Sequence, residues 1–410
     1  MAATTLPRLP TLPPDRGLPE AAELLAGGGA DRVARFLEAR DLEPHRVEAA
    51  QAHYRPGRWL AVCYRTSAVE RWSGRPVGLT VTAELRAGEP ERIWPFPEDP
   101  ALPGLPEATD AATVARCLRA CPDEVALEPI RYRPRRRAVL RYRLVDGTTL
   151  FAKVVTPTRA RRLRALTAAL RTGSGDPPSG VGFALPVGRV ASGALVFPGA
   201  PGRSLRDLLL AGAPLPAPDR LASLPADIHR RCGPALAGAP ELAGLRPRRR
   251  FDPVVALAAA QMVARLVPSR AGAAARLAEA LITWAEASEA PDEWVVHGDL
   301  YENQVLVDGD RLTLIDLDDV GPGDPLLDAA NVSAHLLLLA TSGAPASSAI
   351  GRYRADLRAA FCRALDVDPA DLAWREAYCL LRLATGPFRV LHPEWAARTA
   401  ARLDLAVEAL

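Results

Sequence analysis

The stretch His297-Gly298-Asp299-Leu300-Tyr301-Glu302-Asn303-Gln304 decides how this 410-residue chain is interpreted. An apolar run at 305–307, a turn at 308–310 and a second apolar run ending at Asp316 follow it. This pattern predicts a strand, a loop, a β-hairpin and an acidic residue at a strand end. The stretch therefore presents two carboxylates, Asp299 and Asp316, on neighbouring loops.

Two carboxylates in this arrangement suit phosphoryl transfer, which needs little covalent chemistry from the protein. One carboxylate orients the attacking hydroxyl and accepts its proton, and Asp299 fits that role. Mg²⁺ prefers few protein ligands, usually one or two carboxylates besides phosphate oxygens, and Asp316 fits as a metal ligand. The residues alone therefore predict the transfer of a phosphate group.

A single lysine, Lys153, occurs among the 51 lysine and arginine residues of the chain. Such a bias is typical of a GC-rich genome, in which arginine replaces lysine wherever either residue serves. A lysine that persists indicates a need for a compact ammonium group on a flexible stem, which the planar arginine fork does not reproduce. Lys153 is therefore a candidate functional cation, with chance survival as the alternative.

Composition and charge exclude several other classes of protein. The net charge of +3 argues against a dedicated nucleic-acid binder, which would show a concentrated basic surface. Residues 1–14 lack the apolar core of a signal peptide, and the leucine run at 336–339 is too short to span a bilayer. The six scattered cysteines are typical of thiols in a reducing compartment. We expect a soluble cytoplasmic protein without nucleic-acid or membrane partners, and the sequence does not indicate its oligomeric state.

The length predicts two or three packed units. Expected in order are a flexible tail (1–18), an accessory α+β region (19–128), a small sheet lobe (129–198) and a helical lobe with the catalytic loop (199–410). Lys153 lies on a strand predicted at 149–155. A strand–turn–strand pattern at 53–64 recurs at 131–144, which indicates an internal repeat or two unrelated short hairpins. Only the second copy is expected to belong to a nucleotide site; the first is interpreted as a decayed duplicate or an accessory cap.

The segment 297–330 resembles the catalytic region of the aminoglycoside phosphotransferase family, a group related to choline kinases and more distantly to protein kinases. The residues that carry the resemblance are His297-Gly298-Asp299, Ile315-Asp316, Gly323-Asp324-Pro325 and Asp328-Ala329. Weaker agreement runs from about residue 131 to the C-terminus. Residues before about 128 show no match.

The resemblance implies an α+β, two-lobed protein-kinase-like fold and an ATP- or GTP-dependent kinase that uses Mg²⁺. Its acceptor would be a hydroxyl of a small molecule, such as a sugar, an aminoglycoside-like compound or an amino alcohol. It also implies roles for individual residues: Asp299 as catalytic base, Asp316 as principal Mg²⁺ ligand, Lys153 as the contact of the α- and β-phosphates, Asp328 as a brace of the catalytic loop, His297 as a supporting residue, and Phe197, Gly199 and Ala200 as the hinge that contacts adenine.

The sequence departs from the family pattern at three places. Gln304 stands where the second metal ligand is usually asparagine, so either Gln304 or the preceding Asn303 is the expected ligand, and the strand register favours Gln304. The helix predicted at 158–170 contains arginines and no acidic partner for Lys153, which leaves Asp316 or Asp176 as the substitute. The turn 134–137 carries three arginines in place of a glycine-rich phosphate loop, and it either binds phosphate or is simply solvated.

The sequence offers two alternatives to an active kinase. The segment 314–320, with three aspartates among apolar residues, also matches the nucleophile loop of haloacid-dehalogenase-type phosphatases, but that chemistry needs a lysine further along the chain and none follows Lys153. The other alternative is a kinase-like protein that binds nucleotide without turnover. Asp318 and Asp324, near the catalytic loop, either attract a cationic acceptor or serve as metal support and turn caps.

Overall fold

The computed structural model describes residues 11–172, 181–239, 242, 250–288 and 294–410. The chain divides into two compact units. Unit 1 comprises residues 1–101, 254–278 and 381–404, and unit 2 comprises residues 102–253, 279–380 and 405–410. The N-terminal region thus shares a unit with two segments that the sequence assigned to the helical lobe.

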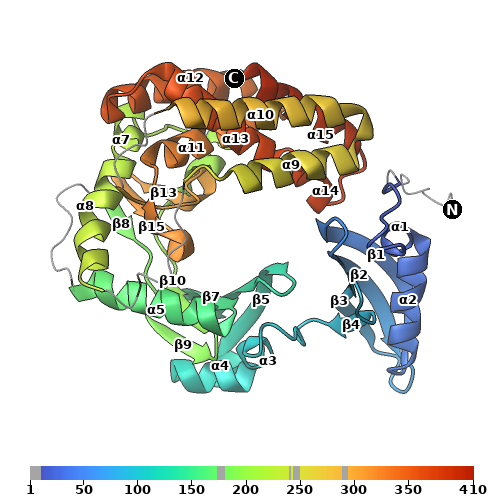
Figure 1. Ribbon diagram of the computed structural model, residues 1–410. Helices are drawn as coiled ribbons and strands as arrows, with labels where there is room; N and C mark the ends of the chain where they lie inside the picture. Colours follow the sequence, from blue (N-terminus) through green and yellow to red (C-terminus); the bar gives the residue numbers. More distant parts are fainter. Residues whose placement is uncertain (1–10, 173–180, 240–241, 243–249, 289–293) are drawn as a thin grey trace. The chain divides into compact units, whose positions relative to one another are not determined.

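Unit 1 is built on an antiparallel sheet covered on one face by helix α2 (Figure 1). Its strands follow chain order: β1 (Leu42–Arg55), β2 (Trp59–Glu70), β3 (Pro76–Arg86) and β4 (Arg92–Pro95). The helices are α1 (Ala21–Leu25), α2 (Gly27–Glu38), α9 (Pro253–Leu266), α14 (Gly386–Arg389), most of α15 (Trp395–Glu408) and the start of α10 (Ala271–Ala287).

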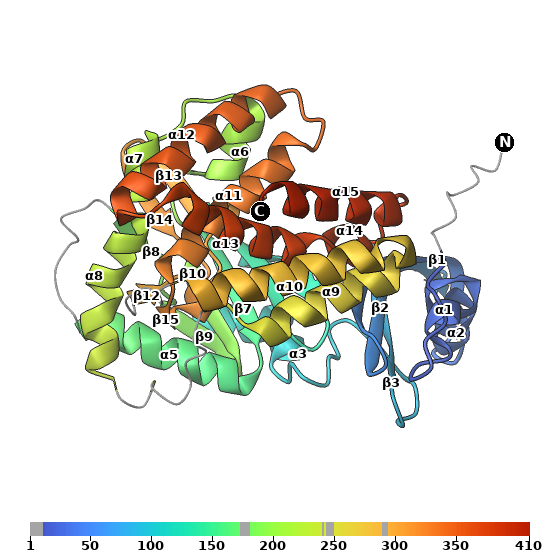
Figure 2. The ribbon, with the colours of Figure 1, turned by 45° about the horizontal axis from the view of Figure 1, so that its top comes forward.

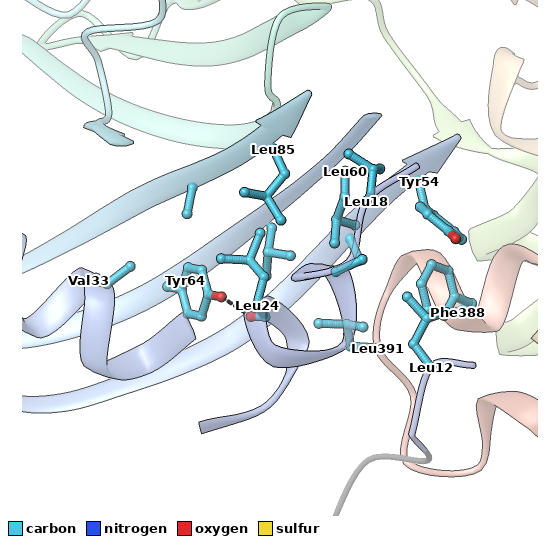
Figure 3. Close-up of a cluster of buried hydrophobic side chains, with 14 of the residues drawn as sticks. Leu12, Leu18, Leu24, Val33, Tyr54, Leu60, Tyr64, Leu85, Phe388 and Leu391 are labelled. Carbon is cyan, nitrogen blue, oxygen red and sulfur yellow. Dashed lines mark hydrogen bonds between the residues drawn. The ribbon is translucent and has the colours of Figure 1, made fainter. Parts of the chain in front are cut away.

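The core of unit 1 joins the sheet to residues from both ends of the chain, as Figure 3 shows. Leu60 and Tyr64 point from β2 toward Leu24, whose carbonyl accepts a hydrogen bond from the Tyr64 hydroxyl. Leu12 and Leu18 are only 2% and 3% exposed. Residues 11–18, expected to be part of a flexible tail, are therefore packed, because their leucines bury apolar surface.

The two hairpins of the suspected repeat have the same local geometry. Each has a three-residue loop, since Arg55 pairs with Trp59 in one and Arg133 with Arg137 in the other. The middle loop residue has a positive φ in both, 70° at Gly57 and 59° at Arg135. Three-residue loops with one left-handed residue are common in hairpins, so this agreement fits both a repeat and two unrelated hairpins.

Unit 2 contains a five-stranded antiparallel sheet in the order β5-β6-β7-β10-β9. Lys153 lies on the central strand, opposite Val139 of β6 and Leu195 of β10. The strands are β5 (Val125–Arg133), β6 (Arg137–Leu144), β7 (Thr149–Val155), β9 (Gly188–Ala191) and β10 (Ala194–Pro198), and the helices beside them are α3 (Leu105–Ala108), α4 (Ala111–Leu118) and α5 (Pro157–Thr172).

The boundary predicted at residue 128 lies inside β5. Segments before it already belong to unit 2: the buried Tyr142 of β6 donates a 2.7 Å hydrogen bond to the carbonyl of Ala108 in α3. The sheet needs this cover because Tyr142 is buried and its hydroxyl requires a partner there.

The rest of unit 2 is mainly helical and carries two small sheets that hold the segment 297–330, which the sequence predicts to be catalytic (Figure 2). One sheet has the order β11-β13-β14-β8, and the other pairs β12 with β15. Their strands are β8 (Val181–Phe183), β11 (Arg203–Ser204), β12 (Trp294–Val296), β13 (Val305–Asp308), β14 (Arg311–Leu314) and β15 (Gly321–Gly323). The helices are α6 (Leu205–Ala211), α7 (Pro218–Ala222), α8 (Leu224–Ala237), α11 (Pro325–Ala340), α12 (Ser347–Leu365) and α13 (Pro369–Leu383).

Asp15 fastens the first hairpin of unit 1. Its carboxylate accepts hydrogen bonds from the Tyr54 hydroxyl and from the backbone N–H groups of Gly57 (2.8 Å) and Gly17 (2.9 Å). Burial by itself would raise the pKa of Asp15, but these hydrogen bonds outweigh it and the pKa lies below its ordinary value. The ionised carboxylate is therefore the form that the folded state prefers.

We predict that Asp15→Ala lowers the free energy of unfolding at pH 7 by about 2–3 kcal/mol, because buried donors lose their acceptor. A lowered folded-state pKa stabilises only above the unfolded pKa, so the deficit should shrink as the pH falls below about 4. Chemical denaturation across this pH range measures it, with the exposed Asp31→Ala as the control. Equal stability of the two variants at pH 7 would contradict this role of Asp15.

Candidate active site

The predicted catalytic loop, residues 297–301, connects β12 to the short 3₁₀ helix η4 (Glu302–Gln304) and contains Asp299. Gly298 has a φ of 81°, a conformation that glycine adopts without strain, and it precedes the half-buried Asp299. Burial, followed by the negative charge of Asp299, raises the pKa of Tyr301. The Tyr301 phenol therefore lies within range of electrostatic interaction with the Asp299 carboxylate.

Helix α11 holds this loop through its first turn. The Asp328 carboxylate accepts hydrogen bonds from the backbone N–H groups of His297 (2.7 Å) and Gly298 (3.0 Å). The His297 ring is buried, with Nε2 3.0 Å from the carbonyl oxygen of Ile315. Asp324 caps the helix through the N–H of Leu326 and contacts Arg375 at 2.6 Å. Asp324 is thus a helix cap, one of the two roles that its position in the sequence suggested.

Two further residues of α11 contact the loop and were missed from the sequence. Asn331 donates a 2.8 Å hydrogen bond to the Leu300 carbonyl, and the His335 ring stacks on Tyr301 with centroids 4.4 Å apart. Together with Asp328 they occupy positions i, i+3 and i+7 of one helix face. Polar residues at this spacing in an otherwise apolar helix are the signal that could have identified them.

Asp316 is the centre of a buried group of charges. It follows β14 in a left-handed conformation, with φ 62°, which aspartate tolerates better than most residues. One carboxylate oxygen accepts from Lys153, and the other accepts from Arg137 at 2.8 Å and from Gln304 at 3.3 Å. Burial opposes the charge, but Lys153 and Arg137 outweigh it and hold the pKa of Asp316 well below its usual range.

Lys153 has a second carboxylate partner. Its Nζ lies 2.5 Å from Oδ1 of Asp318, and that side chain is only 1% exposed. Asp316, one of the two expected substitutes for the missing helix glutamate, does pair with Lys153. The other, Asp176, lies outside the described residues. The pairing with Asp318 was not anticipated.

The two candidates for the second metal ligand differ in their surroundings. Gln304 is 4% exposed and points its amide at Asp316, whereas Asn303 is exposed. The hairpin explains the contact: the Gln304 carbonyl accepts from the N–H of Ile315, so Gln304 and Asp316 lie at the same end of β13 and β14.

The predicted hinge residues lie on the strand beside Lys153 and beyond its end. Phe197 of β10 is opposite Phe151 of β7, and the N–H of Gly199 donates a 2.9 Å hydrogen bond to the Thr149 carbonyl. Ala200 follows and is partly buried. One contact cluster thus comprises Lys153, Arg137, Gln304, Asp316 and Asp318. The predicted hinge residues lie on the neighbouring strand and just beyond its end.

The composition of this cluster fits a phosphate and a hard cation. Within the described part of the chain, Nε of Arg137 is buried without a hydrogen-bond partner, which leaves a guanidinium donor available to an anion. Asp316 and Gln304 offer oxygen atoms, the donors that Mg²⁺ takes. The described residues contain no group of three or more His, Cys, Asp or Glu arranged around a metal position.

Comparison with known proteins identifies the family. The model described as the phosphotransferase enzyme family matches residues 136–377, more than half of the chain, so the chain belongs to this family. This confirms the resemblance, the α+β protein-kinase-like fold and the class of small-molecule kinase. No curated protein matches.

Several solved structures are similar over most of the chain. A macrolide 2'-phosphotransferase, MphH from Brachybacterium faecium, shares 18% identity at a TM-score of 0.40 and covers 75% of this chain and 98% of its own. A thermostable mutant of the aminoglycoside phosphotransferase APH(4)-Ia shares 17% sequence identity at a TM-score of 0.47. The match covers 73% of this chain and 98% of that protein. A choline/ethanolamine kinase family protein from Mesorhizobium loti shares 17% sequence identity at a TM-score of 0.47. The match covers 73% of this chain and 92% of that protein.

None of the helices searched, all within the described ranges, is long and apolar enough to cross a membrane.

We predict that Asn331→Ala loosens the catalytic loop, because the Leu300 carbonyl loses its donor; the expected loss of stability is about 1 kcal/mol. Hydrogen exchange of the peptide covering 297–304 should become faster while exchange in β5–β7 stays unchanged. Ser342→Ala is the control, because this side chain, just beyond the far end of α11, also donates a hydrogen bond to a backbone carbonyl. Unaltered exchange in the loop would show that Asn331 does not hold it.

Proposed function

We propose that this protein transfers the γ-phosphate of ATP to a hydroxyl of a small molecule with the help of Mg²⁺. The observation that carries the proposal is the contact of Lys153 and Arg137 with Asp316, in the unit that also contains the Asp299 loop. Two cations on adjacent sheet strands suit the phosphates, and a carboxylate between them suits the metal. GTP in place of ATP is an outcome that a nucleotide comparison would reveal.

Each residue has a distinct task in this proposal. Lys153 and Arg137 bind phosphate oxygens, while Asp316 and Gln304 are the residues that would hold Mg²⁺. The bound ion supplies charge that neutralises the phosphates as they react. Asp299 accepts the proton of the acceptor hydroxyl while the new O–P bond forms and the bond from the γ-phosphorus to the ADP oxygen breaks.

The supporting residues keep these groups in place. Asp328 holds the backbone before Asp299 and thereby fixes the direction of the base. Phe197, Gly199 and Ala200 are proposed to contact the adenine ring, because Phe197 lies on the strand next to that of Lys153 and the other two follow the end of this strand. We infer a cytoplasmic enzyme, since all six cysteines are free thiols and the chain is compositionally unlike a secreted disulfide protein.

The alternative is a kinase-like protein that binds nucleotide without turnover. The ion pairs that occupy both oxygens of Asp316 favour it, because they compete with a metal ion. A screen of hydroxylated acceptors with labelled ATP and Mg²⁺ separates the two functions. Sugars, aminoglycosides, macrolides and amino alcohols form the panel. Nucleotide binding without phosphorylation of any acceptor would favour the binding protein.

We predict that Asp299→Asn reduces the rate of phosphate transfer by about 10²–10⁴-fold, because the acceptor hydroxyl loses its base. The affinity for ATP should change little, since Asp299 is not proposed to contact the nucleotide. Steady-state kinetics and calorimetry measure the two quantities. Asp310→Asn, in the exposed β13–β14 turn, controls for the loss of one charge. Full turnover by the Asp299 variant would remove it from the mechanism.

We predict that Gln304→Ala raises the Mg²⁺ concentration needed for half-maximal ATP binding by about tenfold, because one oxygen ligand is lost. Asn303→Ala should leave it within about twofold, because Asn303 faces solvent. Calorimetric titrations of ATP at several Mg²⁺ concentrations compare them. The reverse order of effects would assign the ligand to Asn303.

A further inference from the structure

Helix α5 contacts the acidic loop through arginines and, as its sequence shows, carries no acidic partner for Lys153. Arg159 donates from Nε to Asp318 (2.8 Å) and from Nη2 to Asp319 (3.2 Å). Arg162, three residues on and therefore on the same face, donates to the Val320 carbonyl at 2.9 Å. One face of α5 thus binds residues 318–320 through hydrogen bonds from Arg159 and Arg162. Arg161 of the same helix is exposed.

Asp318 connects Arg159 of α5 to Lys153. One of its carboxylate oxygens accepts from Lys153 Nζ at 2.5 Å, and the other accepts from Arg159. A buried carboxylate with one cation on each oxygen has a fixed orientation. The helix therefore provides a cation, Arg159, and the loop provides the carboxylate that reaches Lys153.

This connection matters because Lys153 shares its other partner with the proposed metal. When a cation binds Asp316, the lysine loses part of that partner, while Asp318 remains. A lysine ammonium on a flexible stem needs such an anchor to stay aimed at phosphate. We propose that Asp318 is a positioning residue that holds Lys153, and that Arg159 holds Asp318 in turn. The assignment of phosphate as the target of Lys153 rests on the proposed function; the anchoring itself does not.

The single lysine allows the anchor to be tested without nucleotide. Acylation of amines by a small amine-specific reagent modifies only Lys153 and the N-terminus, which peptide mass spectrometry distinguishes. Asp318→Asn should make Lys153 react at least about fivefold faster, because a charge-assisted hydrogen bond is lost. Arg159→Gln should give a smaller increase in the same direction, and Arg161→Gln, on the same helix but exposed, should give none.

A double-mutant cycle on ATP affinity then tests whether Asp318 acts through the lysine. Asp318→Asn and Lys153→Ala should each raise the Kd for ATP in the presence of Mg²⁺ by about tenfold. In the Lys153→Ala background, Asp318→Asn should add no further loss. A merely structural residue, or one that binds the metal itself, would add its effect in both backgrounds.

The outcomes separate this inference from the proposed function. Unchanged acylation of Lys153 in Asp318→Asn, or fully additive losses of ATP affinity, would overturn the anchor. Faster acylation in Asp318→Asn and in Arg159→Gln, together with a wild-type protein that binds neither ATP nor GTP, would support the anchor and overturn the proposed function instead. Circular dichroism like that of Arg161→Gln, with a cooperative thermal transition above the assay temperature, shows that both variants are folded.

Discussion

The ion pair between Lys153 and Asp316 is the interaction on which the rest of the site depends. It joins the middle of the β5–β10 sheet to the end of β14 across 163 positions of sequence. Both groups are largely buried, and removing one partner of such a pair costs about 3–5 kcal/mol because the other charge is left uncompensated. Arg137, Asp318 and Arg159 continue the alternation of charge around the pair. The cluster therefore requires each member for the burial of the next.

Helix α11 supplies the second constraint by holding the catalytic loop along one face. Asp328, Asn331 and His335 contact successive parts of 297–301, so the loop follows the helix almost residue by residue. Burial raises the pKa of Asp328, although His297 and the backbone donors oppose this. The backbone N–H groups of the loop stabilise the carboxylate that holds the loop in place. The conformation of the loop therefore depends on the position of α11.

Sequence reasoning predicted the strongly periodic parts of this arrangement and missed what depends on side-chain direction. The strand with Lys153, the β13–β14 hairpin and most helices follow from hydrophobic pattern and turn residues. The Asp318–Arg159 contact does not, because neither a basic helix nor an acidic loop indicates which residue it will face. Likewise, nothing local reveals that residues 254–278 and 381–404 pack with the N-terminal sheet, since long-range packing sets that choice. The domain limits and the roles of the site residues stay predictions.

The central claim is that the charges around Asp316 form a site for nucleotide phosphates and a divalent cation. The most direct test is a crystal structure with Mn²⁺ and a non-hydrolysable ATP analogue, using anomalous scattering to locate the metal. We expect a Mn²⁺ peak about 2.2 Å from a carboxylate oxygen of Asp316, with Lys153 turned to the phosphates. A nucleotide bound elsewhere, or a metal position away from Asp316, would contradict it.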